Sequence, residues 1–220
     1  MNDSTTSSGL KIIDQDNYEV AYNEAQDILS KSSPIEICAR SGAELLEENG
    51  RKKIKLSFLN DSLIITHPDI SVSYLDKDNK VSMWLKILVL HYLIYSKGTP
   101  ETGEQITFKQ LEGGLGYYPA FQKRTIAPIL ENFPDLGDFI KAGELIGGMR
   151  SGQGDFSVTF TVFPRMTATY IFWNGDEDFP AEGSVVFDSS FKDYLTTEDI
   201  VVMCNMISIM MIKKKYSGLI

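Results

Sequence analysis

The sequence predicts an α+β protein, a single domain with antiparallel strands flanking a central helical region. Three observations support this prediction. Apolar and polar residues alternate at 53–75 and again at 156–173, which is typical of half-buried strands. The apolar run at 81–96 and the segment 198–215 have the length and composition of helices. No internal repeat or Gly/Ser-rich linker divides the 220 residues, so we expect one domain.

Two helices and a small sheet are expected first. Apolar residues at helical spacing predict an amphipathic helix at 17–30. Ser33-Pro34-Ile35-Glu36 predicts the capped start of a second helix, which should end at Asn49-Gly50. An antiparallel meander should follow, with strands at 53–58, 63–66 and 72–75.

The rest of the chain is expected to return from helices to strands. The run 81–96 has few polar positions on any face, so it predicts a central helix that is covered on most sides. Further helices are expected near 107–113, at 119–133 with a kink at Pro128, and at 136–146. The C-terminal third should hold strands at 156–162, 168–173 and 185–187, then helices at 190–195 and 198–215.

Composition limits the classes of function. With 21 Lys and Arg against 30 Asp and Glu, the net charge of -9 argues against binding to nucleic acid or a membrane surface. Cys38 and Cys204 form no disulfide framework, which fits a cytoplasmic setting. Residues 1–16 lack the features of a signal peptide and predict a disordered tail before the domain at 17–220. The most apolar window, 200–212, is too short to span a bilayer.

An acidic segment offers one candidate site. The sequence has no phosphate-binding loop, no zinc-protease motif and no nucleophile elbow. Oxygen-rich loops coordinate divalent metals or supply an acid and a base, which would suit a hydrolase or transferase. A solvated turn with helix-capping carboxylates is the alternative. The candidate metal ligands are Asp176, Glu177, Asp188 and Glu198.

His91 offers the second candidate site. It lies inside the most apolar predicted helix, where an unpaired imidazole is destabilising, so it needs either a hydrogen-bond partner or a bound metal or cofactor. Aromatic residues near it in sequence would line a mostly apolar pocket with one polar contact, as cofactor sites do. The candidate pocket residues besides His91 are Trp84, Tyr92, Tyr117, Tyr118 and Phe121.

Three stretches resemble one protein family. They are Met83–Leu93 (MWLKILVLHYL), Ile106–Gly114 (ITFKQLEGG) and Trp173–Ala181 (WNGDEDFPA), the last continuing to Phe187-Asp188. Together they resemble DUF 3786, a domain-of-unknown-function family of anaerobic bacteria and archaea. The resemblance implies organisms that use corrinoid and iron–sulfur chemistry in one-carbon metabolism. The Asp-x-His-x-x-Gly pattern of common cobalamin domains is absent from this sequence.

Three hypotheses about function follow. The first is a non-catalytic cytoplasmic binding protein of anaerobic metabolism, which holds a corrinoid or other tetrapyrrole cofactor, or a partner enzyme of one-carbon metabolism. The second is a metal-dependent hydrolase or transferase that uses the acidic cluster at 176–199. The third is a protein-only adaptor.

Overall fold

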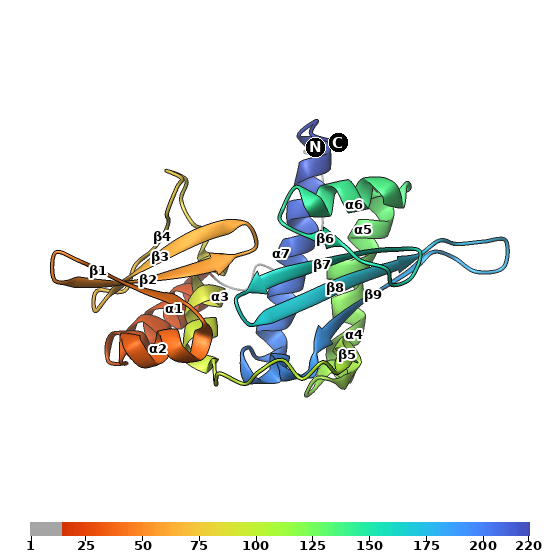
Figure 1. The fold of residues 1–220 in the computed structure, drawn as a ribbon. Helices are drawn as coiled ribbons and strands as arrows, with labels where there is room; N and C mark the ends of the chain where they lie inside the picture. Colours follow the sequence, from red (N-terminus) through yellow and green to blue (C-terminus); the bar gives the residue numbers. More distant parts are fainter. Residues whose placement is uncertain (1–14) are drawn as a thin grey trace, which may run out of the picture.

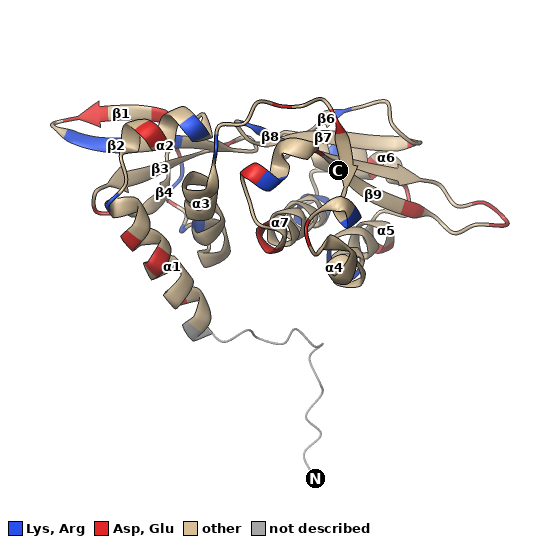
Figure 2. Cartoon of the chain, turned by 90° about the horizontal axis from the view of Figure 1, so that it is seen from below, with Lys and Arg blue, Asp and Glu red and all other residues tan. Residues whose placement is uncertain are grey.

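The computed structural model describes residues 15–220, which form two antiparallel sheets above a row of helices (Figures 1 and 2). The α+β class is therefore confirmed, with the main helical region between the strands of the two sheets. The tail predicted for residues 1–16 lies outside the described residues, except that Gln15 and Asp16 already belong to the first helix. Within residues 15–220, no helix combines the length and the apolar character needed to cross a bilayer.

The N-terminal half contains the first sheet, whose strands follow the order β1-β2-β3-β4. Two helices precede it and one follows it. The elements are α1 (Gln15–Ser30), α2 (Pro34–Ser41), β1 (Glu44–Glu48), β2 (Arg51–Phe58), β3 (Asp61–His67), β4 (Val72–Tyr74) and α3 (Met83–Tyr95).

The C-terminal half contains the second sheet, in the order β5-β9-β8-β7-β6. Its strands are β5 (Gln105–Thr107), β6 (Met149–Arg150), β7 (Phe156–Phe163), β8 (Met166–Trp173) and β9 (Glu182–Asp188). Its helices are η1 (Phe108–Gln110), α4 (Gly114–Phe121), the π-helical η2 (Gln122–Ile126), α5 (Ala127–Asn132), α6 (Leu136–Glu144), η3 (Ser189–Asp193) and α7 (Thr197–Tyr216).

The second predicted helix is shorter than expected. α2 ends where Gly42 adopts a left-handed φ of 75°, and residues 44–48 form β1 instead of more helix. Asn49-Gly50 is therefore a hairpin turn and not a helix end. β1 is held in place by its pairing with β2, where Lys55 bridges the Glu44 carboxylate at 3.1 Å.

Two further details differ from the predictions. Ser33 is the N-cap residue of α2, but its side chain makes no capping hydrogen bond. The helix predicted at 119–133 is divided by the π-helical turn η2, so the irregularity precedes Pro128 and is not a kink at that residue. A wider turn of this kind shifts the side chains that follow it around the helix axis.

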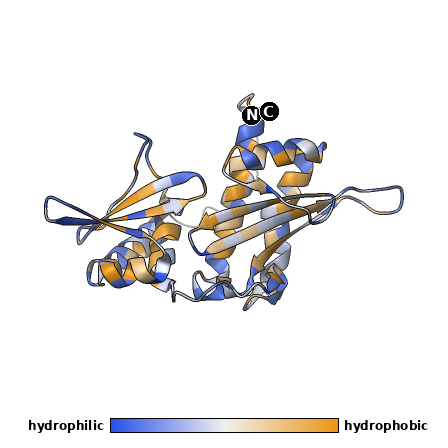
Figure 3. Cartoon of the chain, viewed as in Figure 1, coloured by the Kyte–Doolittle hydropathy of each residue, from blue (hydrophilic) through white to orange (hydrophobic). Residues whose placement is uncertain are grey.

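The α3 and α7 helices lie deepest in the structure. Hydrophilic residues concentrate in the projecting hairpin loops, whereas the helices and strands between them carry apolar side chains (Figure 3). In α3, Leu88, Val89 and Leu93 are fully buried. The helix packs on α1, α2 and α7. Two buried hydrogen bonds fix α7: Tyr170 Oη donates to the Cys204 carbonyl at 2.8 Å, and Ser208 Oγ donates to the Thr125 carbonyl at 3.0 Å.

The two sheets meet at the ends of β2 and β7. The Leu59 N–H donates to the Val162 carbonyl at 3.0 Å, and the turn containing Asn60 packs against Gly147. A Cβ on Gly147 would lie 3.0 Å from the Asn60 backbone nitrogen, so the close approach requires glycine there. The buried apolar residues of both halves form one continuous core.

We predict that the two halves unfold together, because their buried apolar residues form one core. Each half contains one tryptophan, Trp84 or Trp173, so Trp84→Phe and Trp173→Phe leave a fluorescent reporter in the other half. Urea unfolding of each variant is followed by tryptophan fluorescence and by circular dichroism. In both variants the two signals should give the same midpoint. Two separate midpoints, or two stable proteolytic fragments cut within 147–154, would contradict a single cooperative domain.

Candidate functional site

A hydrogen bond between two partly buried side chains joins α3 to α7. His91 Nδ1 lies 2.8 Å from Asp199 Oδ1, and the two side chains are 21% and 11% exposed. The hydrogen bond expected for His91 is therefore present, and its partner lies 108 residues further along the chain. The pair is partly buried, and the ring is not sealed in the core.

Asp199 is itself held by the start of α7. The Thr196 hydroxyl donates to Asp199 Oδ2 at 2.7 Å, and the Asp199 N–H donates to Thr196 Oγ1 at 3.2 Å. Thr196 thus caps the helix and orients the carboxylate at the same time. A carboxylate in the first helical turn is stabilised by the helix dipole. Because a carboxylate only accepts, the hydrogen of this bond lies on Nδ1, and the uncharged form of the ring then has its lone pair on Nε2. Among residues 15–220, none hydrogen-bonds to Nε2.

Aromatic side chains flank the imidazole. Trp84, His91 and Tyr95 follow one stripe of α3, and Trp84 and Tyr95 are 43% and 42% exposed. The Tyr95 ring lies 5.4 Å from the His91 ring, centroid to centroid. On the other side, Tyr18 of α1 lies 4.2 Å from the Trp84 ring. An aromatic surface with one imidazole at its centre therefore faces outward between α1 and α7.

Charged groups from two further elements reach this surface. Burial raises the pKa of the Tyr18 hydroxyl; the Arg124 cation opposes that rise and the Glu198 anion adds to it. Burial likewise raises the pKa of Tyr95, with a further contribution from Asp199. Arg124 belongs to η2, so the π-helical turn brings a cation towards α1. Turns of this type are frequent at functional sites.

The other predicted pocket residues do not join His91. Tyr92 faces the opposite way: its ring stacks on Phe163 at 4.2 Å and its hydroxyl donates to the Ser41 carbonyl. Burial raises the pKa of this hydroxyl far above its usual value. The three α4 residues are separated from α3 by α7 (Figures 1 and 2). Of these, Tyr117 is exposed, while Tyr118 and Phe121 line a separate cavity of about 170 Å³.

The expectation of a six-residue cofactor pocket is therefore corrected to a smaller set. Only His91 and Trp84 share a surface, because Tyr92, the residue next to His91, points to a different side of α3, and α7 lies between α3 and α4. The α4 cavity is also smaller than the roughly 300–1,000 Å³ typical of cofactor pockets. His91 lines neither this cavity nor the groove of about 680 Å³ between α1 and the strands β2 and β3.

The four predicted metal ligands are not brought together. Within residues 15–220, no group of three or more His, Cys, Asp or Glu side chains is arranged to hold a metal ion. Asp176 and Glu177 lie at the tip of the β8–β9 hairpin, Asp188 at the far end of β9, and Glu198 on α7. A seven-residue strand such as β9 spans about 20 Å, so sequence proximity does not give spatial proximity here.

Asp176 and Asp188 both act on the local backbone. Asp176 Oδ1 accepts from the N–H groups of Asp178 and Phe179 at 2.9 and 2.8 Å, as in a capped turn. Asp188 accepts from the N–H groups of Thr102 and Gly103 at 3.0 and 2.8 Å, and from that of Ser190 at 2.9 Å. It therefore ties the segment before β5 to the end of β9.

Sequence reasoning did not select Thr196, Tyr18 or Arg124, and it placed Asp199 only in the acidic cluster at 176–199. One signal was available: Thr196 and Asp199 have the spacing of a helix cap, which places a carboxylate at a helix start. Nothing in the sequence indicates that this carboxylate meets His91, because that contact depends on how α3 packs on α7.

Comparisons with known proteins identify a family and no characterised relative. The family described as Domain of unknown function (DUF3786) matches residues 33–210. That segment contains His91, Asp199 and both sheets. Neither a curated protein nor a solved structure matches the chain.

We predict that Asp188 stabilises the fold in a pH-dependent way. Burial alone raises its pKa, but the backbone hydrogen bonds from Thr102, Ser190 and Gly103 outweigh it, and its pKa falls from 3.8 to about 2. The carboxylate therefore stabilises the folded state above pH 3.8, and this contribution is lost as pH falls towards 2. Solvent screening of this partly exposed carboxylate limits the contribution to about 1–2 kcal/mol.

Urea unfolding of Asp188→Asn tests this. At neutral pH the variant should be less stable than the wild type by about 1–2 kcal/mol, since one amide oxygen replaces the charged acceptor. The difference should shrink as the pH approaches 2. Asp178→Asn, an exposed carboxylate on the hairpin tip, is the matched control and should change little. A gap that stays constant down to the lowest accessible pH would contradict the assignment.

Proposed function

The chain belongs to the domain-of-unknown-function family DUF3786, and from the geometry of its site we propose that it is a binding protein for a metal-centred cofactor of the tetrapyrrole class, such as a corrinoid. In this proposal His91 Nε2 would bind the metal of the cofactor. The observation that carries it is the pairing of His91 Nδ1 with Asp199 at 2.8 Å, which leaves Nε2 available.

The donor set at His91 fits a metal-centred group. Histidines that bind metals typically donate their other ring N–H to a carboxylate, which fixes the ring and raises its basicity. Thr196 supports Asp199 in turn. Trp84 and Tyr95 would pack against a flat macrocycle through their exposed faces. When bound, the cofactor supplies the metal-centred chemistry, while these residues bind and orient it.

The cellular setting is part of the same proposal. The anaerobic one-carbon context comes from the family resemblance, and a partner enzyme that uses the cofactor belongs to it. Two free, buried cysteines, Cys38 and Cys204, support a reducing cytoplasmic compartment.

A second candidate uses the same pair as an acid–base catalyst. A carboxylate-oriented imidazole with a free Nε2 can accept a proton from a bound substrate. This would move the proposed hydrolase or transferase site from the 176–199 cluster to His91, with Tyr95 beside it.

Absorption titrations distinguish these functions. We expect cobinamide, a corrinoid without its own nitrogenous lower ligand, or haemin to show a saturable spectral shift when the full chain is added. His91→Ala should abolish the shift while circular dichroism stays unchanged. Asp199→Asn should weaken binding about 10–100-fold, as second-shell changes do. His67→Ala removes the other histidine and should bind like the wild type.

Equal spectral shifts from the wild type and His91→Ala would contradict metal binding by His91. No shift with either probe would contradict tetrapyrrole binding. The acid–base role and a protein-only adaptor would then remain, and a hydrolytic activity lost in His91→Ala would favour the former.

A further inference from the structure

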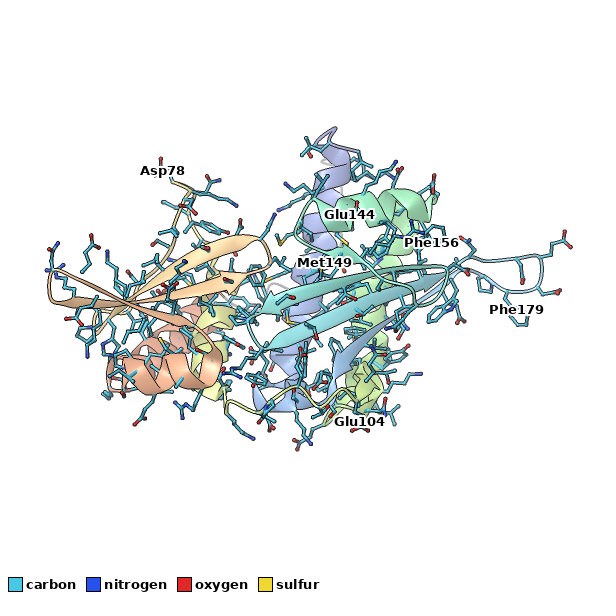
Figure 4. All side chains as sticks on the ribbon, in the orientation of Figure 1. Asp78, Glu104, Glu144, Met149, Phe156 and Phe179 are labelled. Atoms are coloured by element: carbon cyan, nitrogen blue, oxygen red, sulfur yellow. The ribbon has the colours of Figure 1, made fainter. Side chains whose placement is uncertain are left out.

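The cavity of about 170 Å³ beside α4 has a lining of its own at the edge of the second sheet. Three elements form it: the turn η1 after β5, the junction of α4 and η2, and the strand β9. In the view of Figures 1 and 4, α4 and β5 lie at the lower end of the molecule, where Glu104, the residue before β5, is labelled. Because α7 lies between α3 and α4, the cavity is not part of the His91 surface.

Apolar side chains form the inner wall of this cavity. The Phe108 and Phe121 rings stack with their centroids 4.1 Å apart and their planes 8° from parallel. Both residues line the cavity, and so does Val185 of β9; all three are buried. Flat, buried rings of this kind favour contact with another aromatic ring or a short apolar group.

Three polar side chains border the same cavity. Tyr118 and Gln122 are one helical turn apart, so they lie on one side of the helix, and Gln122 Nε2 donates to Tyr118 Oη. The Lys109 ammonium group comes from η1 and lies 4.1 Å from the centroid of the Tyr118 ring. A cation and a phenolic hydroxyl are therefore brought together at one side of the cavity.

Both of these groups keep donors for a ligand. Within residues 15–220, Lys109 makes no salt bridge. The Tyr118 hydroxyl accepts from Gln122, and its own hydrogen goes to no acceptor in the described part of the chain. The Thr107 N–H donates to Gln110 Oε1 at 2.8 Å, which fixes the turn that carries Lys109. An ammonium and a hydroxyl held side by side can donate to the two oxygens of one carboxylate.

The size and orientation of the cavity limit the ligand further. A cavity of roughly 150 Å³ holds one benzene molecule, so about 170 Å³ is enough for a single ring and too small for a nucleotide or a macrocycle. Lys109 is exposed, whereas Phe121 and Val185 are buried. A ligand would therefore place its apolar body inward and its charged group at the solvent side.

We propose that this cavity binds a small aromatic carboxylate, a molecule with one ring and one carboxylate group. The carboxylate accepts from Lys109 Nζ and Tyr118 Oη, and the ring packs on Phe121 and Val185. An amine of the same shape would meet the Lys109 cation and be repelled. The cavity shares no residue with the His91 surface, so this inference does not depend on the proposed cofactor.

NMR chemical-shift titration of the full, nitrogen-15-labelled chain with benzoate tests the proposal. We expect saturable shifts at residues of η1, α4 and β9, with a dissociation constant of roughly 0.1–1 mM for a ligand of this size. Two further probes separate the contributions. Benzamide keeps the ring without the charge, and acetate keeps the carboxylate without the ring, so each should bind at least about tenfold more weakly than benzoate.

Variants then assign the contacts, with circular dichroism as the check on folding. Lys109→Gln should weaken benzoate binding at least about tenfold, whereas Lys109→Arg should largely retain it. Tyr118→Phe keeps the ring and loses the hydroxyl, so binding should weaken about three- to tenfold. Lys123→Gln is the matched control, because this exposed lysine is not among the lining residues. It should bind like the wild type, and so should His91→Ala.

Four outcomes would overturn the proposal. They are the absence of saturable shifts with benzoate up to roughly 20 mM, equal affinity of the wild type and Lys109→Gln, benzamide that binds as tightly as benzoate, and shifts confined to α3 and α7. The last would place benzoate at the His91 surface instead of in this cavity.

Discussion

The requirement to cover two largely apolar helices organises this protein. α3 is buried on most sides and gathers α1, α2 and the first sheet around it, whereas α7 is covered by α4, α5 and α6 and by the second sheet. The two halves share a core where the ends of β2 and β7 meet and where α3 contacts α7. The His91–Asp199 pair lies at that contact.

The sequence predicted the fold class and most elements because their signals are local. The alternation at 156–162 and 168–173 became β7 and β8, and the apolar run at 81–96 became α3. β1 was missed because its residues, Glu44–Glu48, have a helix-compatible composition and are strands only through pairing with the lysines of β2. The π-helical turn η2 likewise has no pattern that distinguishes it from an α-helix.

The candidate site was predictable only in part. His91 was identified because an imidazole within an apolar helix needs a partner, a physical requirement that holds whatever the fold. The aromatic and acidic residues chosen with it were grouped by their proximity in sequence, and the fold separates them: α7 lies between His91 and Tyr118, and β9 lies between Glu177 and Asp188. The true neighbour, Asp199, depends on a helix contact made across 108 residues.

The way α7 is anchored has a consequence for recognition. The Tyr170–Cys204 and Ser208–Thr125 hydrogen bonds are buried, so sliding α7 along its axis would leave donors and acceptors unpaired, at about 1–3 kcal/mol each. Asp199 lies on the first turn of α7, so it cannot shift along the helix axis unless these two hydrogen bonds break. The imidazole orientation is therefore preorganised, and a ligand that binds His91 as proposed would meet a nitrogen whose position is already fixed.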